Sequence, residues 1–181
     1  MNCPNCNSDI EYFTNKIFYC HTCNKLFSYL KYNFDPLLDI LEGCKDIEQD
    51  PVWHPEGDVL THSLQTFKIA YKESNNIDLV LAALLHDVGK QIKKLHHAKE
   101  SVKLIEGLVS DKTLWLVQHH MRIWSFLLGE MRKYMKVQEY YNHKWLKDLI
   151  MVARWDKMGR NPNIKVEYNR EVIEKQLRSL L

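Results

Sequence analysis

Four side chains in the sequence have the types and surroundings that a divalent cation requires. His86 and Asp87 follow the apolar run from Val80 to Leu85, while His62 lies upstream of them and Asp156 downstream. A charged Asp at the end of an apolar helix is unfavourable unless a partner compensates it. Imidazole and carboxylate bind divalent metals, and the two carboxylates balance the charge of such a cation while leaving room for water. We therefore predict that His62, His86, Asp87 and Asp156 converge on one metal.

A cation held in this way suggests chemistry on phosphate esters. It would bind a phosphoryl oxygen and lower the pKa of a coordinated water, which supplies a nucleophile at neutral pH. Charge that develops on the non-bridging oxygens needs cationic donors nearby. Lys90 follows His86 by about one helical turn, and Arg160 follows Asp156 by about one turn. We expect Asp87, Lys90 and Arg160 to be catalytic, with plain surface charge as the alternative for the two cations.

A second group of potential ligands lies near the N-terminus. Cys3-Pro-Asn-Cys6 and Cys20-His-Thr-Cys23 form two CxxC pairs, with 13 residues between Cys6 and Cys20. Four thiolates would complete a closed tetrahedral shell around Zn²⁺, which is typical of a structural site. The pattern resembles a zinc ribbon. Two disulfides are the alternative, and Cys44 is expected to be an ordinary buried thiol.

Length and composition limit the classes of protein to consider. The chain has 181 residues, of which 45% are hydrophobic, enough for one domain with a core and a small appendage. The 6 Gly and 5 Pro are too few for a collagenous or largely disordered chain. The apolar runs are too short to cross a bilayer, and the N-terminus lacks the pattern of a secretory signal. We expect a cytoplasmic protein with no membrane partner.

Two regions differ in composition. Residues 1–33 contain four of the five Cys, with aromatic residues between them, and are expected to form a small β-rich module. Residues 34–181 have helical periodicity and predict an all-α bundle, so the fold class is mainly α. Residues that cap or break helices place the helices at about 35–41, 58–73, 77–86, 97–109, 111–120, 125–136, 144–158 and 168–180.

Charge is unevenly distributed along the chain. Residues 34–58 hold eight acids and one Lys, whereas residues 90–103 hold five Lys and one Glu. Such a field can steer an anionic substrate, although solvated helix faces would give the same pattern. Residues 1–33 hold three Lys and two acids, and four thiolates with Zn²⁺ would add −2. Strong nonspecific phosphate binding by this module is not indicated; it would contact nucleic acid by base stacking, contact a protein, or dock on the helices.

The order His62, His86-Asp87, Asp156 resembles the HD superfamily of metal-dependent phosphohydrolases, an all-α fold, over about residues 50–160. His54-Pro-Glu-Gly-Asp58, and Asp156 followed by Gly159-Arg160, are similar to the HD domain attached to bacterial CCA-adding tRNA nucleotidyltransferases. That likeness implies phosphatase and 2′,3′-cyclic phosphodiesterase activity. The chain is too short to include the nucleotidyltransferase domain as well. Lys90 stands where some nucleotide-specific members have Glu, which argues against the 5′-deoxynucleotidase type.

The resemblance also implies a second metal. In binuclear HD proteins, additional His residues between the HD pair and the final Asp hold another ion, and the Asp of the pair bridges the two. His97 and His119 fit that placement best among the candidates, which include His96 and His120. Surface or hydrogen-bonded histidines are the alternative reading of both residues.

These patterns lead to three hypotheses. The first is a phosphohydrolase that uses Mn²⁺, Mg²⁺, Ni²⁺, Co²⁺ or Fe²⁺ and acts on a nucleotide or an RNA-end phosphoester, 2′,3′-cyclic phosphate being one candidate. The second is a binuclear hydrolase of dinucleoside polyphosphates or a diiron oxygenase. The third is a non-catalytic zinc-ribbon module that binds nucleic acid or protein. Base stacking would explain one of four tryptophans near the motifs, and core packing most of them: Trp53, Trp115, Trp124 and Trp155.

Overall fold

The computed structural model describes residues 8–9, 11–14, 17–28 and 33–181 of the chain. Two predicted zinc ligands, Cys3 and Cys6, lie outside the described residues. Helices dominate the described part and begin at residue 35, in agreement with the expected mainly α fold.

The described N-terminal segment forms a three-stranded antiparallel sheet, with strands β1 (Glu11–Thr14), β2 (Ile17–Cys20) and β3 (Lys25–Ser28) in sequential order. The register places Tyr19 opposite both Glu11 and Leu26. A four-residue turn connects β2 to β3, and Asn24 closes it with a left-handed φ of 54°. The β-rich character of this region agrees with the sequence, whereas its zinc shell stays a prediction.

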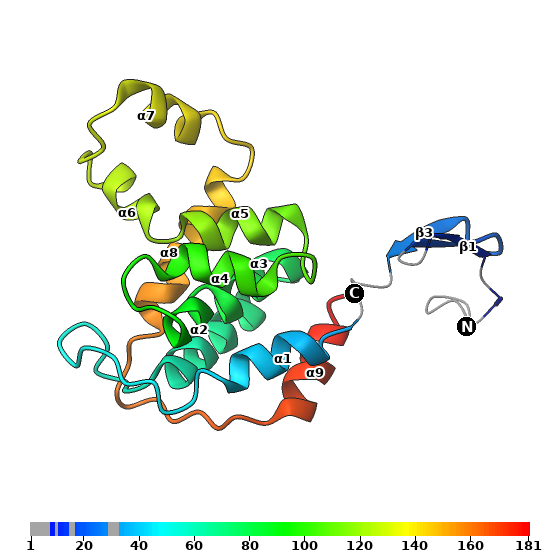
Figure 1. The fold of residues 1–181 in the computed structure, drawn as a ribbon, viewed down its shortest axis with the longest axis horizontal. Coiled ribbons are helices and arrows are strands. Elements are labelled where there is room, and N and C mark those ends of the chain that lie inside the picture. Colours follow the sequence, from blue (N-terminus) through cyan, green and yellow to red (C-terminus); the bar gives the residue numbers. More distant parts are fainter. Residues whose placement is uncertain (1–7, 10, 15–16, 29–32) are drawn as a thin grey trace.

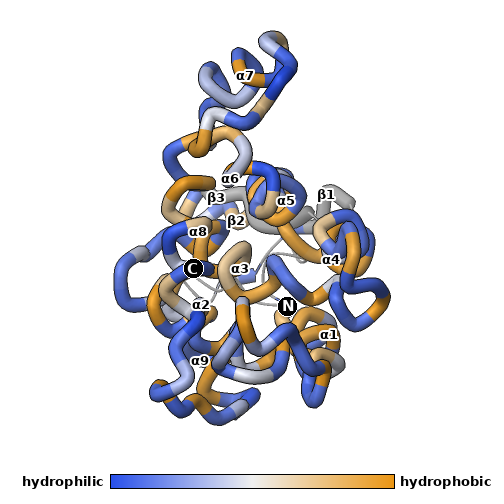
Figure 2. Tube along the Cα trace, turned by 90° about the vertical axis from the view of Figure 1, so that its left-hand side faces the viewer, coloured by the Kyte–Doolittle hydropathy of each residue, from blue (hydrophilic) through white to orange (hydrophobic). Residues whose placement is uncertain are grey.

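The helical part packs around one apolar helix. Its helices are α1 (Asp35–Glu42), α2 (Val59–Glu73), α3 (Ile77–Leu85), α4 (His97–Ile105), α5 (Asp111–His119), α6 (Arg122–Leu127), α7 (Tyr134–Tyr141), α8 (Leu146–Met158) and α9 (Arg170–Arg178), with the short 3₁₀ helix η2 (Val88–Gln91) between α3 and α4. Helix α3 contacts α2, α5 and α8 and lies in the middle of the helices (Figure 2). Because α3 is surrounded, its apolar residues are buried: Leu79, Val80, Leu81, Ala82, Ala83, Leu84 and Leu85.

Polar side chains determine where the two central helices begin. The carboxylate of Asp58 accepts a hydrogen bond from the backbone N–H of Thr61 at 2.7 Å, and this caps α2. The side chain of Asn76 caps α3 in the same way through the N–H of Asp78 at 3.0 Å. Such caps satisfy N–H groups that have no partner inside the helix. They fix the starting points of α2 and α3, and so the positions of His62 and His86.

One predicted helix is wrong. The sequence suggested a single helix over residues 125–136, but the structure has α6 and α7 on either side of a turn. Gly129 lies in this turn with a φ of +70°, a conformation that other residues seldom adopt. Helix α7 therefore extends away from the other helices (Figures 1 and 2) and leaves Tyr134, Met135 and Tyr141 exposed.

Ion pairs connect the last helix to the first. Arg170 at the start of α9 bonds to Asp39 at 2.6 Å and to Asp35 at 3.0 Å, both on α1. The two helices lie side by side at one end of the bundle (Figure 1). None of the helices that the structure describes has both the length and the apolar character needed to cross a bilayer.

Candidate metal centre

Four donor atoms meet at the end of helix α3. His62 Nε2 lies 3.1 Å from Asp156 Oδ1, 3.3 Å from His86 Nε2 and 3.8 Å from Asp87 Oδ2. His86 Nε2 lies 3.5 Å from Asp87 Oδ2 and 3.8 Å from Asp156 Oδ1. All four side chains are buried. Ligands that each stand about 2 Å from a common ion have separations of this size. His62, His86 and Asp87 form a group that fits one divalent cation, and Asp156 lies beside its two histidines.

The second oxygen of Asp87 faces another pair of histidines. Asp87 Oδ1 lies 2.9 Å from His97 Nε2 and 3.4 Å from His120 Nε2, and these two nitrogens are 3.1 Å apart. Both rings are buried. The three side chains fit a second cation, with the carboxylate of Asp87 shared between the two positions.

The predicted second-metal ligand His119 and its neighbour His120 lie in different surroundings. His120 contacts Asp87, whereas His119 Nδ1 lies 2.5 Å from the hydroxyl of Tyr140 and its ring packs against Trp115. Adjacent residues on a helix point about 100° apart, so only one of the two can face the centre. Burial, the positive charge of Arg122 and that of His143 lower the pKa of His119 to about 4.

Hydrogen bonds at the far side of three rings determine which nitrogen faces the centre. Nδ1 of His86 lies 3.0 Å from the carbonyl of Ala83, Nδ1 of His97 lies 2.9 Å from that of Lys94, and Nδ1 of His120 lies 2.7 Å from that of Val117. A carbonyl oxygen only accepts hydrogen bonds, so each Nδ1 must carry the proton. With the proton on Nδ1, it is Nε2 of each ring that faces inward.

These inward-facing nitrogens require a positive partner. Nε2 of His97 faces Nε2 of His120 and a carboxylate oxygen of Asp87, and all three are acceptors when the rings are neutral. Acceptors at such separations repel one another unless a proton or a cation lies between them. Orientation of a histidine through its other nitrogen is also a common feature of metal sites. The donor set thus suits a cation such as Zn²⁺, Mn²⁺ or Fe²⁺.

Glu56 contacts the outer nitrogen of His62. Its Oε1 lies 2.7 Å from Nδ1 of His62, along a bent rather than linear hydrogen-bond direction, and 2.9 Å from Nδ1 of His54. The carboxylate side chain is fully buried. Although burial alone would raise the pKa of Glu56, its contacts with His54 and His62 lower it to about 2. Glu56 is therefore ionised and holds His62 in position.

Burial and opposite charge separate the pKa values of the central groups. Burial would lower the pKa of His62, but the carboxylates of Asp156 and Glu56 outweigh it and raise that pKa to about 9. Burial lowers the pKa of His86 to about 3, so this ring is neutral. The neighbouring histidines and cations hold the pKa values of Asp87 and Asp156 below their usual range despite burial. Two carboxylates and a neutral imidazole are thus ready to bind a cation.

A close approach of helix α4 brings His97 to the centre. The backbone N–H of Gly89 donates to Ser101 Oγ at 2.8 Å, and that hydroxyl donates to the carbonyl of His86 at 2.8 Å. A Cβ atom on Gly89 would lie only 2.2 Å from the carbonyl oxygen of His97. Gly89 therefore allows α4 to pack directly against the turn that carries His86 and Asp87.

Two predicted catalytic cations lie at the edge of the centre. Lys90 Nζ lies 2.6 Å from Asp87 Oδ2 and donates to Gln49 Oε1 at 2.5 Å. Nη2 of Arg160 lies 2.9 Å from Asp156 Oδ1 and 3.1 Å from its Oδ2. The structure thus brings both residues beside the carboxylates, as the spacing suggested. Their catalytic roles stay predictions.

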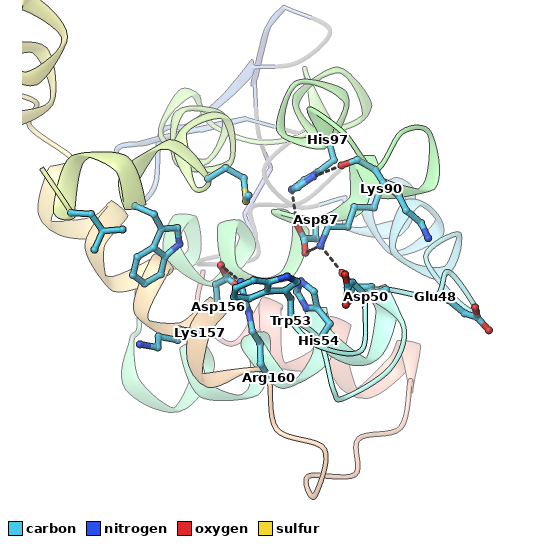
Figure 3. A pocket seen from close by; sticks show the side chains of 15 residues that line it. Glu48, Asp50, Trp53, His54, Asp87, Lys90, His97, Asp156, Lys157 and Arg160 are labelled. Carbon is cyan, nitrogen blue, oxygen red and sulfur yellow. Dashed lines mark hydrogen bonds and ion pairs between the residues drawn. The ribbon is translucent and has the colours of Figure 1, made fainter. Parts of the chain in front are cut away.

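The centre opens into a cavity of about 640 Å³ (Figure 3). Asp87, His97 and Asp156 form its inner end. Charged, aromatic and apolar side chains complete its lining: Glu48, Gln49, Asp50, Trp53, His54, Lys90, Lys94, Met121, Trp124, Leu128, Lys157 and Arg160. A ligand in this cavity can therefore reach the shared carboxylate and several cations at once.

The cysteines are not among the residues of this centre. Cys20 is buried at the end of β2, and Cys23 is half-buried in the following turn. Because Cys3 and Cys6 fall outside the described residues, the four-thiolate shell stays a prediction. Cys44 is buried, as expected, with its Sγ 3.8 Å from the carbonyl of Ile40. Burial and the nearby carboxylates raise the pKa of its thiol to about 12, so it is inert.

The helical fold of residues 34–181 and the buried His/Asp cluster define a mainly α protein with a candidate metal centre. The sequence profile of the HD domain family matches residues 59–159, more than half of the chain, so the chain belongs to this family. HD domains place it in a superfamily of metal-dependent phosphohydrolases. The chain is also similar to the multifunctional CCA protein of Halorhodospira halophila (strain DSM 244 / SL1), with 40% identity over 57 residues. That match covers 32% of this chain and 13% of the relative's length.

Proposed function

We propose that this chain is a divalent-metal-dependent phosphohydrolase that acts on a nucleotide or an RNA-end phosphoester, with 2′,3′-cyclic phosphates among the candidate substrates. One observation carries the proposal: Asp87 directs its two carboxylate oxygens to two separate groups of inward-facing histidine nitrogens, at the inner end of an open cavity. Membership of the HD family supports the reaction class.

The residues around the centre would have different roles in the hydrolysis of a phosphoester. When bound, divalent cations polarise the phosphoryl oxygens and lower the pKa of a water. Arg160 holds both oxygens of Asp156 and so fixes the orientation of that ligand. Lys90 is held between Asp87 and Gln49, from where its ammonium can donate to a phosphoryl oxygen. Such donors, arranged before substrate binds, stabilise the charge that develops during hydrolysis.

The similarity to a CCA protein supports the RNA-end substrate. The aligned relative is named a multifunctional CCA protein, and the similarity covers 57 residues. The cavity also carries Lys94 and Lys157 beyond the two inner cations. These charges favour an anionic substrate.

A phosphoester screen tests the proposal. The purified protein is loaded in turn with Mn²⁺, Mg²⁺, Ni²⁺, Co²⁺ or Fe²⁺ and offered 2′,3′-cyclic nucleotides, mononucleotides and dinucleoside polyphosphates. We expect metal-dependent hydrolysis of at least one class, abolished by a chelator and restored by the metal. Absence of hydrolysis across the panel, together with salt-sensitive binding of nucleic acid, would instead favour the non-catalytic binding module.

A second candidate function follows from the second group of histidines. If Asp87 held a cation on each of its two sides, the pair would suit hydrolysis of a dinucleoside polyphosphate, because adjacent cations can stabilise both the attacking and the leaving oxygen. His97 and His120 supply the additional nitrogens. Two metal ions per chain and a preference for dinucleoside polyphosphates over cyclic phosphates in the same screen would support this alternative. Iron-dependent oxygen consumption without hydrolysis would point to a diiron oxygenase instead.

We further propose that the four cysteines of the N-terminal module hold one structural Zn²⁺ and that this module contacts the substrate or a protein partner. Cys20 is the last residue of β2 and Cys23 lies in the turn that follows, close enough in sequence for a shared ion. The site would be supported if wild type contains zinc that a chelator can remove and if a Cys20→Ser, Cys23→Ser double variant lacks this zinc. A disulfide between these cysteines in the purified protein would oppose it.

A further inference from the structure

The mouth of the cavity carries apolar side chains that the proposed hydrolysis does not use. Trp53 is 66% exposed, Met121 51% and Leu128 67%, and all three line the same cavity as Asp87 and Asp156. Trp124, which is half-buried, also lines it. Large apolar groups exposed around a concave site commonly mark the place where a ligand is covered.

These residues come from two different parts of the fold. Trp53 belongs to the turn before α2, where its backbone N–H donates to the carbonyl of Asp50 at 3.1 Å. Met121, Trp124 and Leu128 belong to α6 and the residues next to it. In Figure 3, Trp53 and His54 lie in front of Asp156, toward the viewer's side of the centre. The apolar rim is thus built from a tightly turned loop and a separate helix.

Charge around the rim distinguishes between ligands. Lys90 and Arg160 contact the carboxylates of the centre. These contacts place positive charge at the inner end of the cavity. Asp50, three residues before Trp53, is an exposed carboxylate of the cavity lining, whereas the carboxylate of Glu48 points away from the cavity in Figure 3. An alkyl chain gains nothing from a carboxylate, and the lysines of the same lining, Lys94 and Lys157, suit the phosphate part of a ligand rather than its apolar part. A planar ring with exocyclic N–H donors satisfies both the aromatic and the acidic groups.

We propose that the rim formed by Trp53, Met121, Trp124 and Leu128 is a nucleobase subsite, in which the base of a nucleoside phosphoester stacks on Trp53 while its phosphate reaches the His/Asp centre. A base with an exocyclic amino group, such as adenine, suits the neighbouring carboxylate of Asp50. This inference rests on the proposed phosphohydrolase function and specifies its substrate class: nucleosidic phosphoesters rather than simple sugar phosphates.

Binding measured without turnover tests the subsite. The probes are adenosine 5′-methylenephosphonate, whose P–C bond resists hydrolysis, its base-free ribose counterpart, and octylphosphonate as an alkyl rival. Each is titrated calorimetrically into the Mn²⁺-loaded full chain. Because stacking on one aromatic side chain strengthens binding appreciably, we expect the adenosine compound to bind about 10-fold tighter than the base-free one. Equal binding of these two compounds, or tighter binding of octylphosphonate, would overturn the proposal.

Substitutions of Trp53 test whether this residue causes the preference for the adenosine compound. Trp53→Leu should remove most of the advantage of the adenosine compound and leave the affinity of the base-free compound unchanged, and Trp53→Phe should restore part of it. Tyr134→Leu is the matched control, because Tyr134 is 71% exposed on α7 and is not part of the cavity lining. Circular dichroism checks that each variant is folded. An unchanged preference in Trp53→Leu would contradict the subsite.

The outcomes separate this inference from the proposed function. Metal-dependent hydrolysis without any preference for the adenosine compound would refute the nucleobase subsite alone. A Trp53-dependent preference without hydrolysis of any phosphoester would refute the hydrolase and leave a nucleoside-binding site. The same variants should show the effect in kinetics: Trp53→Leu raises KM for a nucleotide substrate more than it changes kcat.

Discussion

Asp87 Oδ1 lies 2.9 Å from Nε2 of His97, although the two residues belong to different elements that meet only because α4 packs against the turn after α3. The other oxygen of Asp87 faces His62 and His86. One carboxylate therefore belongs to two groups of ligands at once. This sharing makes Asp87 the residue on which both cation positions depend, and the predictions below follow from it.

Substitution of Asp87 should remove both cation positions together. In Asp87→Ala, neither group of histidines keeps a carboxylate from this position, so we expect loss of bound metal from both. Because a bound cation contributes several kcal/mol to the stabilisation of the transition state, hydrolysis should fall by about 1000-fold or more. Metal content by elemental analysis and the rate of phosphate release measure the two effects. Asp111→Ala, an exposed residue at the start of α5, is the control; full turnover in Asp87→Ala would refute the assignment.

The adjacent histidines at the end of α5, His119 and His120, allow a direct comparison. His120 faces Asp87, whereas His119 contacts Tyr140, so the two substitutions should differ in their effect. His120→Gln should lower the metal content from two ions per chain to one, and His119→Gln should leave it at two. Elemental analysis after gel filtration measures both. If His119→Gln loses the ion and His120→Gln keeps it, the placement of the second cation is wrong.

Glu56 should strengthen cation binding without touching the cation. Its carboxylate contacts Nδ1 of His62 and so orients that ligand. Loss of such an orienting partner commonly weakens metal binding by about 10- to 100-fold, and we expect Glu56→Gln to raise the Kd for Mn²⁺ by this factor. Glu48→Gln, an exposed residue of the same loop, should leave the Kd unchanged. Equal Kd values for Glu56→Gln and wild type would show that the contact has no orienting role.

Cation affinity should rise with pH. In the cation-free protein the pKa of His62 is raised to about 9, so its ring is protonated at neutral pH and must release this proton to become a ligand. The ion pairs of protonated His62 stabilise the cation-free fold below the ordinary histidine pKa, and this stabilisation is lost as the pH rises through 9. Affinity for Mn²⁺ should therefore increase about tenfold per pH unit from pH 7 and level off near pH 9.

Calorimetric titrations of Mn²⁺ at several pH values, in buffers of different ionisation enthalpy, measure both this slope and the proton released. Glu56→Gln should move the plateau to lower pH, because one of the carboxylates that raise the pKa of His62 is removed. A Kd that does not change between pH 7 and pH 9 would mean that His62 is already neutral in the cation-free protein.

Local signals in the sequence were enough for most of the helical fold. Helices α2 and α3 begin within one residue of the positions that capping and breaking residues suggested. The break between α6 and α7 was missed because the apolar and polar residues of 125–136 continue a helical pattern through Gly129. Whether a single glycine interrupts a helix depends on the tertiary contacts around it, which the local pattern does not contain.

The residues of the metal centre were likewise only partly predictable from the local sequence. His62, His86, Asp87 and Asp156 were found because their order matches a known motif, and the structure brings them together. The choice between His119 and His120 required knowledge of which face of α5 points inward, and this depends on how α5 packs against α3 and α4. The orienting role of Glu56 was missed as well, although its place two residues after His54 within the motif was a signal that could have indicated it.

Anomalous diffraction from crystals of the Mn²⁺-loaded protein tests the central claim most directly. We predict two peaks, one within bonding distance of His62, His86, Asp87 and Asp156, and the other within bonding distance of Asp87, His97 and His120. The carboxylate of Asp87 should lie between them. A map with no peak on either side of Asp87, with the histidine rings turned away from one another, would contradict the account.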